Sequence, residues 1–138
     1  NINRLEPGKR TFHTLMPAMA CRDGKPAILC GTQGGEGQPQ TQAALFTRYA
    51  IQGVPLQESI SRPRWLLGRT WGQTSDTLKL EGRFSPETVA RLRALGHEVE
   101  LFPDFSEAMG HAGAIVRHPN GLFEGAFDPR SNGAAAGF

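Results

Sequence analysis

The chain is organised around one glycine-rich stretch, Gly31-Thr32-Gln33-Gly34-Gly35-Glu36-Gly37-Gln38-Pro39-Gln40. The short apolar run before it, Ala27-Ile28-Leu29-Cys30, is typical of a buried strand, and the pattern from Thr41 to Ile51 predicts a helix. Glycines between a strand and a helix indicate backbone that takes positive φ angles or closely approaches another group. The Gly34-Gly35 pair adds two N–H groups without covering side chains, at a helix N-terminus that favours negative charge.

Three interpretations of this loop stay open on the glycines alone. It could hold a phosphate, it could hold the oxyanion that develops when an acyl group is attacked, or it could be a tight connection without a ligand. The phosphate interpretation lacks support, because the stretch has neither common phosphate fingerprint and no Lys or Arg occurs between Lys25 and Arg48. An acyl oxyanion requires only neutral donors, which this loop offers.

Composition bounds the fold and the classes of partner. With 138 residues, 38% hydrophobic residues, 17 glycines and 10 prolines, the chain suits one turn-rich domain with a sheet. A net charge of +2, with both signs interspersed, gives no indication of nucleic acid or an anionic membrane as partner, and no apolar run reaches membrane-spanning length. The four histidines show no zinc-ligand spacing with Cys21 and Cys30, so we expect no metal and two buried free thiols.

The remaining pattern predicts an α+β arrangement. The expected elements are a hairpin of strands 18–22 and 27–30 around Asp23-Gly24, helices over 41–52, 55–60 and 85–95, strands over 65–67, 77–81 (half-exposed) and 98–101, and a hairpin of strands 112–117 and 122–127 around Asn120-Gly121. In that last hairpin Arg117 is expected to face Glu124, and in the first Arg22 is expected to face Lys25. Ser85 and Gly96 are expected to cap the two ends of the helix over 85–95. Arg62 and Arg64 are expected to pair with carboxylates or carbonyl groups more readily than with a free anion. The small, polar tail 128–138 has the composition of a disordered terminus.

A series of short motifs resembles a known family in the same order along the chain. They are Lys9-Arg10, Phe12-His13-Thr14, Pro17, Asp23-Gly24-Lys25-Pro26, Gly34-Gly35, Ser59-Ile60-Ser61-Arg62-Pro63-Arg64, Phe84-Ser85-Pro86-Glu87-Thr88, Met109-Gly110-His111 and Asp128-Pro129-Arg130-Ser131. This order resembles the C-terminal part of the small subunit of the gamma-glutamyltranspeptidase family, which includes enzymes named cephalosporin acylases. The resemblance covers nearly the whole chain, and residues 1–138 are expected to form a single domain.

The resemblance implies a fold and a mechanism. The family consists of N-terminal nucleophile hydrolases, so it implies part of an α-β-β-α four-layer sandwich and a precursor that cleaves itself. A Thr at the new N-terminus attacks the γ-glutamyl carbonyl, with its own amine as base, and no cofactor is needed. The partners implied are a γ-glutamyl compound or related amide, the large subunit and the remainder of the small subunit of the same precursor, and potentially a second copy.

The resemblance also implies roles for four residues. Gly34 and Gly35 match the oxyanion-hole glycines of the family, in agreement with the interpretation of the loop from its residues. His13 and Thr14 match a Ser-Ser pair that holds the α-carboxylate of the γ-glutamyl group; Thr14 keeps a hydroxyl there, and His13 departs from the pattern. Independently of the resemblance, both residues could line a pocket; equally, Thr14 could satisfy a local backbone group and His13 could be solvated.

Two hypotheses about function follow. In the first, the chain is part of a γ-glutamyl transferase or hydrolase, or of a related amide acylase. Its nucleophile lies upstream of Asn1, because none of its threonines is N-terminal, and the 138 residues alone are therefore expected to be inactive. In the second, the chain is a non-enzymatic α+β domain whose glycine loop binds an anion or nothing.

Overall fold

Two β-sheets form the framework of the chain in the computed structural model, which describes residues 2, 4–69 and 74–137. The first sheet is antiparallel, in the order β1-β2-β6-β7, with β1 (Ala18–Arg22), β2 (Lys25–Gln33), β6 (His111–Arg117) and β7 (Phe123–Phe127). The second contains β3 (Trp65–Leu67), β4 (Leu78–Glu81) and β5 (Val99–Phe102). β3 is antiparallel to β4, whereas β5 is parallel to β4 and is reached through α3 (Pro86–Ala94). The predicted α+β class is confirmed.

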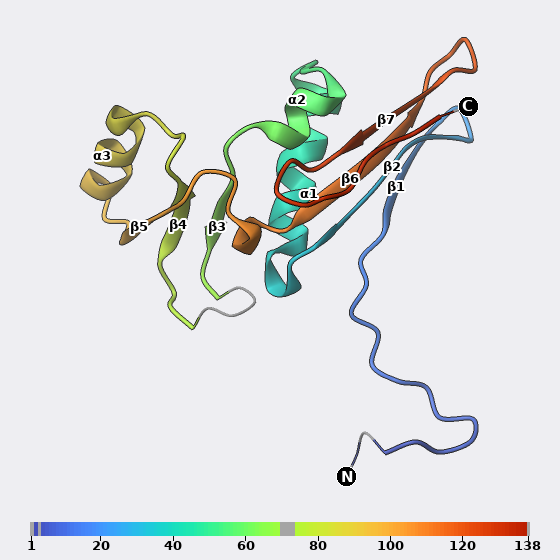
Figure 1. The fold of residues 1–138 in the computed structure, drawn as a ribbon, viewed down its shortest axis with the longest axis horizontal. Helices are drawn as coiled ribbons and strands as arrows, with labels where there is room; N and C mark the ends of the chain where they lie inside the picture. The colour runs from blue at the N-terminus through green and yellow to red at the C-terminus, as the bar shows by residue number, and fades with distance from the viewer. Residues whose placement is uncertain (1, 3, 70–73, 138) are drawn as a thin grey trace.

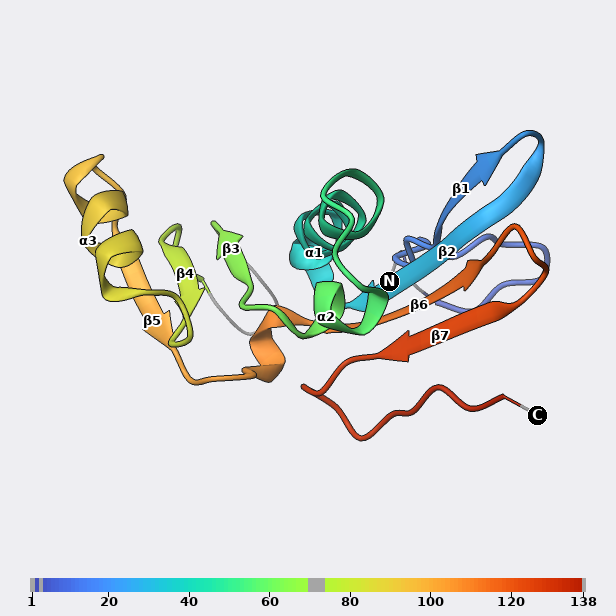
Figure 2. The same ribbon diagram turned by 90° about the horizontal axis from the view of Figure 1, so that it is seen from above.

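Helices cover one face of the four-stranded sheet (Figures 1 and 2). α1 (Gln38–Phe46) continues as a π-helical turn, η2 (Thr47–Ile51), and α2 (Leu56–Ser61) follows. The core between these helices and the sheet consists of small and aliphatic side chains, namely Ile28, Cys30, Leu45, Leu56, Ile60, Ala112, Ala114, Val116 and Ala126. A smaller core of Leu78, Leu80 and Val89 lies between α3 and the second sheet.

The opposite face of the four-stranded sheet is apolar and largely uncovered. Met19, Leu29, Ile115 and Phe123 are all exposed there. The C-terminal tail runs along this side of the sheet, beneath β7 in Figure 2, where a Cβ added to Gly125 would lie 2.9 Å from the Cβ of Ala135. The tail therefore packs on the sheet, contrary to the disorder that its composition predicted. The chain supplies one helical layer and one sheet with a second apolar face, as a layered sandwich requires.

Several local predictions are confirmed. Arg22 lies opposite Lys25 across the two-residue turn, and Asp23 and Gly24 both have positive φ. In α3 the Ser85 hydroxyl accepts a hydrogen bond from the Thr88 N–H at 3.2 Å. Gly96, with φ of 91°, follows that helix as its C-terminal glycine.

No helix in the described part of the chain has the length and apolar character needed to cross a membrane.

Other local predictions are wrong for identifiable reasons. The second hairpin closes at His118 and Leu122 (N–H to O 2.8 Å), so its loop is one residue longer than an Asn-Gly turn. Arg117 consequently lies opposite Phe123, and Glu124 accepts a hydrogen bond from His118 at 2.9 Å.

The boundaries and exposure of three segments also differ from expectation. The first helix begins at Gln38, not Thr41, because Pro39 fits its first turn. Every residue of β4 is buried, not half-exposed, because Lys79 and Glu81 find polar partners inside the protein. Cys30 is buried as expected, whereas the other free thiol, Cys21, is exposed.

Candidate functional site

The glycine loop lies where β2 ends and the helical layer begins. Gly34 has φ of 143° and ψ of 24°, and Gly35 has φ of 52°. A 3-10 turn, η1 (Gly35–Gly37), then leads directly into α1, and the Gly37 N–H donates to the Gly34 carbonyl at 2.9 Å. The first N–H groups of a helix have no acceptor within it, so such an end is suited to a negatively charged oxygen. The positive φ angles predicted for this stretch are confirmed.

The segment that contains His13 and Thr14 lies against the start of α1. The amide of Gln38, the first residue of α1, donates to the Thr14 carbonyl at 3.1 Å, and Gln42 one turn later donates to the Met16 carbonyl at 2.5 Å. Gln38 is itself buried, so this anchor is fixed in the fold. The side chains of His13 and Thr14 are exposed. The fold thus holds this segment against the helix that follows the glycine loop.

A backbone contact supports the glycine loop from behind. Gln33 pairs with His111 at the start of β6, which brings Gly110 against the loop. A Cβ built on Gly34 would lie 3.3 Å from the Cα of Gly110, so the two glycine backbones are in contact. Close approach of this kind is one of the few structural reasons for glycine at a fixed position.

A network of buried charged residues connects the Gly110 backbone, which contacts the glycine loop, to both sheets. The Arg64 guanidinium donates to the Met109 and Gly110 carbonyls at 3.1 and 2.9 Å and pairs with Asp128 at 2.6 Å. Asp128 also accepts from the Ala112 N–H at 2.7 Å. Behind this pair, Arg130 bridges Asp128 at 3.0 Å and Glu81 at 2.6 Å. The expectation that Arg64 pairs within the protein is confirmed, as is that for Arg62, which pairs with Glu58 at 2.7 Å.

The network holds its groups in their charged forms. Burial and the neighbouring Arg130 lower the pKa of Arg64 to about 10, so it stays charged at neutral pH. Burial alone would raise the pKa of Asp128, but Arg64 and the N–H groups of Ala112 and Arg130 outweigh it, and the net pKa lies below the usual value. Burial opposes ionisation of Glu81 as well, yet its bonds from Arg130 and Arg64 bring its net pKa below the usual value.

These lowered pKa values predict loss of stability in acid. A carboxyl with a lowered folded-state pKa contributes fully above its unfolded pKa, which is about 3.9 for Asp and 4.3 for Glu, and loses that contribution as pH falls through the folded value. We expect the thermal unfolding midpoint of the complete protein to fall once the pH is lower than about 4. The difference in thermal midpoint between wild type and Asp128→Asn should narrow as the pH is lowered. A difference in thermal midpoint that stays constant from pH 7 to pH 3 would contradict this link between ionisation of Asp128 and stability.

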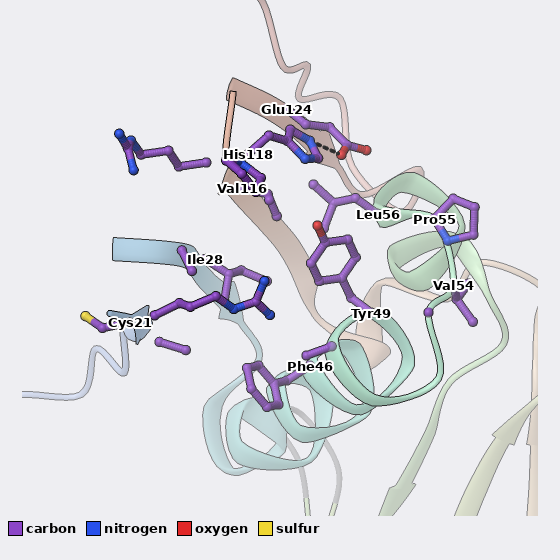
Figure 3. A pocket seen from close by; sticks show the side chains of 17 residues that line it. Cys21, Ile28, Phe46, Tyr49, Val54, Pro55, Leu56, Val116, His118 and Glu124 are labelled. Atoms are coloured by element: carbon purple, nitrogen blue, oxygen red, sulfur yellow. Dashed lines mark hydrogen bonds and ion pairs between the residues drawn. The ribbon is translucent and has the colours of Figure 1, made fainter. Parts of the chain in front are cut away.

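A cavity lies at the other end of the helix-covered face. Its volume is about 590 Å³, and its lining includes Ile28, Tyr49, Leu56 and the hydrogen-bonded pair His118 and Glu124 (Figure 3). Burial and the Glu124 carboxylate raise the pKa of the Tyr49 hydroxyl, partly opposed by Arg22. Ile28 precedes Gln33 by five residues of β2, which corresponds to roughly 17 Å of strand. The cavity is therefore separate from the glycine loop.

Comparison with known proteins identifies the family. The chain matches the family Gamma-glutamyltranspeptidase over residues 1–138. The chain belongs to this family. It is 75% identical over 134 residues to the oxamate amidohydrolase proenzyme of Klebsiella pneumoniae, and 54% identical over 137 residues to the glutathione hydrolase-like YwrD proenzyme of Bacillus subtilis. These matches cover 97% and 99% of the chain but only 25% and 26% of the relatives, so the chain spans about a quarter of their length.

Solved structures agree with membership of the gamma-glutamyltranspeptidase family. Cephalosporin acylase from Bacillus halodurans matches with a TM-score of 0.80 and 29% identity, over 97% of this chain and 24% of the acylase. Gamma-glutamyltranspeptidase from Pseudomonas nitroreducens matches in fold, with a TM-score of 0.78 at 24% identity, over 100% of this chain and 69% of that one. The relatives are enzymes, and the N-terminal nucleophile hydrolase fold implied by the resemblance is confirmed.

Sequence reasoning missed the residues that support the glycine loop. Gln38 fixes the Thr14 segment, and Arg64 fixes the backbone of Met109 and Gly110. Gly110, within the quoted motif Met109-Gly110-His111, was the available signal, because a glycine before a strand often marks a close approach. The partner of that approach is 76 residues earlier, and no local pattern indicates it.

Proposed function

We propose that the complete protein is an amidohydrolase with an N-terminal nucleophile, in which Gly34 and Gly35 bind the oxyanion. The observation that carries this proposal is the 75% identity to an oxamate amidohydrolase proenzyme over 97% of the chain. The geometry supports it, because the loop enters a helix from a strand with two glycines at positive φ and offers neutral donors. The remaining three quarters of the relatives' length would supply the nucleophile.

The proposed reaction is acyl transfer to water. A hydroxyl of the N-terminal residue attacks the amide carbonyl, its proton passes to the α-amine, and the carbonyl oxygen becomes an oxyanion facing Gly34 and Gly35. Collapse of this intermediate breaks the C–N bond, the leaving nitrogen takes the proton, and water then hydrolyses the acyl ester. Donors aimed at the developing charge stabilise the transition state more than the bound substrate.

The substrate class we propose is a short amide that carries a carboxylate close to the scissile carbonyl, of which oxamate is the smallest example. Thr14 and His13 would contact that carboxylate, since Gln38 fixes their segment at the positive end of α1. A second candidate is a γ-glutamyl amide of the glutathione type. The 54% identity to a glutathione hydrolase-like proenzyme favours it.

One assay distinguishes the two candidates. The complete, processed protein is given oxamate or a γ-glutamyl anilide, and release of ammonia or of the aniline is measured. We expect a higher kcat/KM for oxamate. A higher value for the anilide would replace the first substrate class with the second, and turnover of neither would contradict the proposed function. Residues 1–138 alone should turn over neither compound, because the proposed nucleophile lies outside them.

The proposed role of Thr14 predicts a change in substrate binding. Thr14→Val in the complete protein removes a hydroxyl that would bond the substrate carboxylate, and hydrogen bonds to charged groups contribute about 1.5–3 kcal/mol. KM for the preferred substrate should rise roughly 10- to 100-fold. Thr11→Val, in the same exposed segment, is the matched control and should leave KM unchanged. Equal KM values for the two variants would exclude Thr14 from the carboxylate site.

A further inference from the structure

The peptide group between Gln33 and Gly34 joins two features of the loop. A peptide unit is planar, so the Gln33 carbonyl oxygen and the Gly34 N–H point in opposite directions from one rigid plate. Whatever fixes the carbonyl oxygen therefore fixes the direction of the N–H. In the proposed function that N–H faces the developing oxyanion, where direction determines how strongly it stabilises the transition state.

Thr32 and Gly110 both lie against that carbonyl oxygen. The Thr32 hydroxyl donates to the Gln33 oxygen at 2.7 Å. On the neighbouring strand, a Cβ added to Gly110 would lie 2.3 Å from the same oxygen and 2.9 Å from Thr32 Oγ1. Real side chains do not approach a backbone oxygen so closely, so only a glycine hydrogen fits at position 110. Gly110 also has φ of 79°, which disfavours other residues.

Gly110 is itself held rigidly. Arg64 donates to its carbonyl at 2.9 Å, and its own N–H donates to the Glu107 carbonyl at 3.0 Å. The preceding carbonyl, that of Met109, accepts from Thr41 at 3.3 Å as well as from Arg64. The Gly110 backbone that contacts the Gln33 oxygen is thus held by several hydrogen bonds and resists displacement. A methyl group at position 110 would displace the Gln33–Gly34 peptide instead.

We propose that Gly110 and Thr32 are positioning residues that orient the Gly34 N–H toward the oxyanion. This inference rests on the proposed function and assigns roles to two residues that act through the Gln33–Gly34 peptide group. Their effect is confined to the transition state, where charge develops on the oxygen. Disturbing them lowers kcat and kcat/KM together and leaves KM nearly constant.

The first test replaces Gly110 with alanine in the complete, processed protein. We expect Gly110→Ala to lower kcat about 100-fold, the order of loss for one oxyanion donor, with KM within about twofold. Gly121→Ala is the matched control, because Gly121 has a similar φ of 88° but nothing within 4 Å of an added Cβ. Both variants lose stability through backbone strain, but only Gly110→Ala should lose kcat. A kcat within twofold of wild type for Gly110→Ala would overturn the proposal.

The second test uses Thr32 and stays informative if Gly110→Ala does not fold. Thr32→Val keeps the shape of the side chain and removes the hydrogen bond to Gln33, and we expect kcat to fall about tenfold. Thr32→Ser retains the hydroxyl and should restore kcat. Equal activity of the valine variant and wild type would contradict the role of Thr32. Wild-type turnover of the same substrate, measured in parallel, separates failure of this inference from failure of the proposed function.

Discussion

Replacing Gly34 with alanine in the complete, processed protein should lower kcat about 10²- to 10³-fold, with a much smaller change in KM. An alanine at this position would have to adopt φ of 143°, which side chains with a Cβ rarely adopt. Its Cβ would also lie 3.3 Å from the Cα of Gly110, tighter than ordinary contact. The backbone must shift, and the N–H that we propose faces the oxyanion shifts with it. Steady-state kinetics on the preferred amide measure the effect.

Gly31→Ala provides the matched control for this prediction. Gly31 is three residues earlier in β2, has an ordinary φ, and an added Cβ would meet nothing within 4 Å. Its kcat should equal that of wild type. If Gly34→Ala retained wild-type kcat, or if both alanine variants lost activity equally, Gly34 would not have the role proposed for it.

Replacing Asp128 with alanine should destabilise the protein by about 3–5 kcal/mol, because it leaves a buried guanidinium without its counter-charge. The Asp128 side chain is fully buried and bonds Arg64 at 2.6 Å, Arg130 at 3.0 Å and the Ala112 N–H at 2.7 Å. Its loss also removes an acceptor from the start of β6, which adjoins the glycine loop. The free energy of unfolding of the complete protein in urea, at pH 7, measures this effect.

The exposed pair of Glu58 and Arg62 serves as the control for the buried one. Its atoms are 2.7 Å apart, but both side chains are about half exposed. Exposed pairs of this kind contribute at most about 1 kcal/mol, so Glu58→Ala should hardly change the free energy of unfolding. If Glu58→Ala and Asp128→Ala lowered the free energy of unfolding by similar amounts, the buried network around Asp128 would stabilise the protein no more than an exposed ion pair.

The local part of the candidate site could be predicted from the sequence. Gly34 and Gly35 follow an apolar run and precede a helix, and those neighbours alone indicated a strand-to-helix turn with positive φ angles. The family was evident for a similar reason, since its motifs are short and keep their order along the chain. The cap at Ser85 and the turn at Asp23-Gly24 likewise depend on residues close in sequence.

The parts that could not be predicted depend on contacts between distant residues. β4 has the alternating pattern of a half-exposed strand, yet Lys79 and Glu81 are buried because carbonyl groups and Arg130 receive them. Arg130 lies 49 residues after Glu81 in the sequence. The tail was expected to be disordered for the same reason, because its composition does not show that Asp128 and Arg130 are buried anchors.

In the proposed function, Gly34 and Gly35 bind the oxyanion of an amide-cleaving enzyme. The most direct test is a crystal structure of the complete, processed protein trapped as the acyl-enzyme of its preferred amide. We expect the acyl carbonyl oxygen to lie roughly 2.7–3.1 Å from the backbone nitrogens of Gly34 and Gly35. An acyl group whose oxygen contacts other donors, with both glycine nitrogens beyond hydrogen-bond distance, would contradict this role of Gly34 and Gly35.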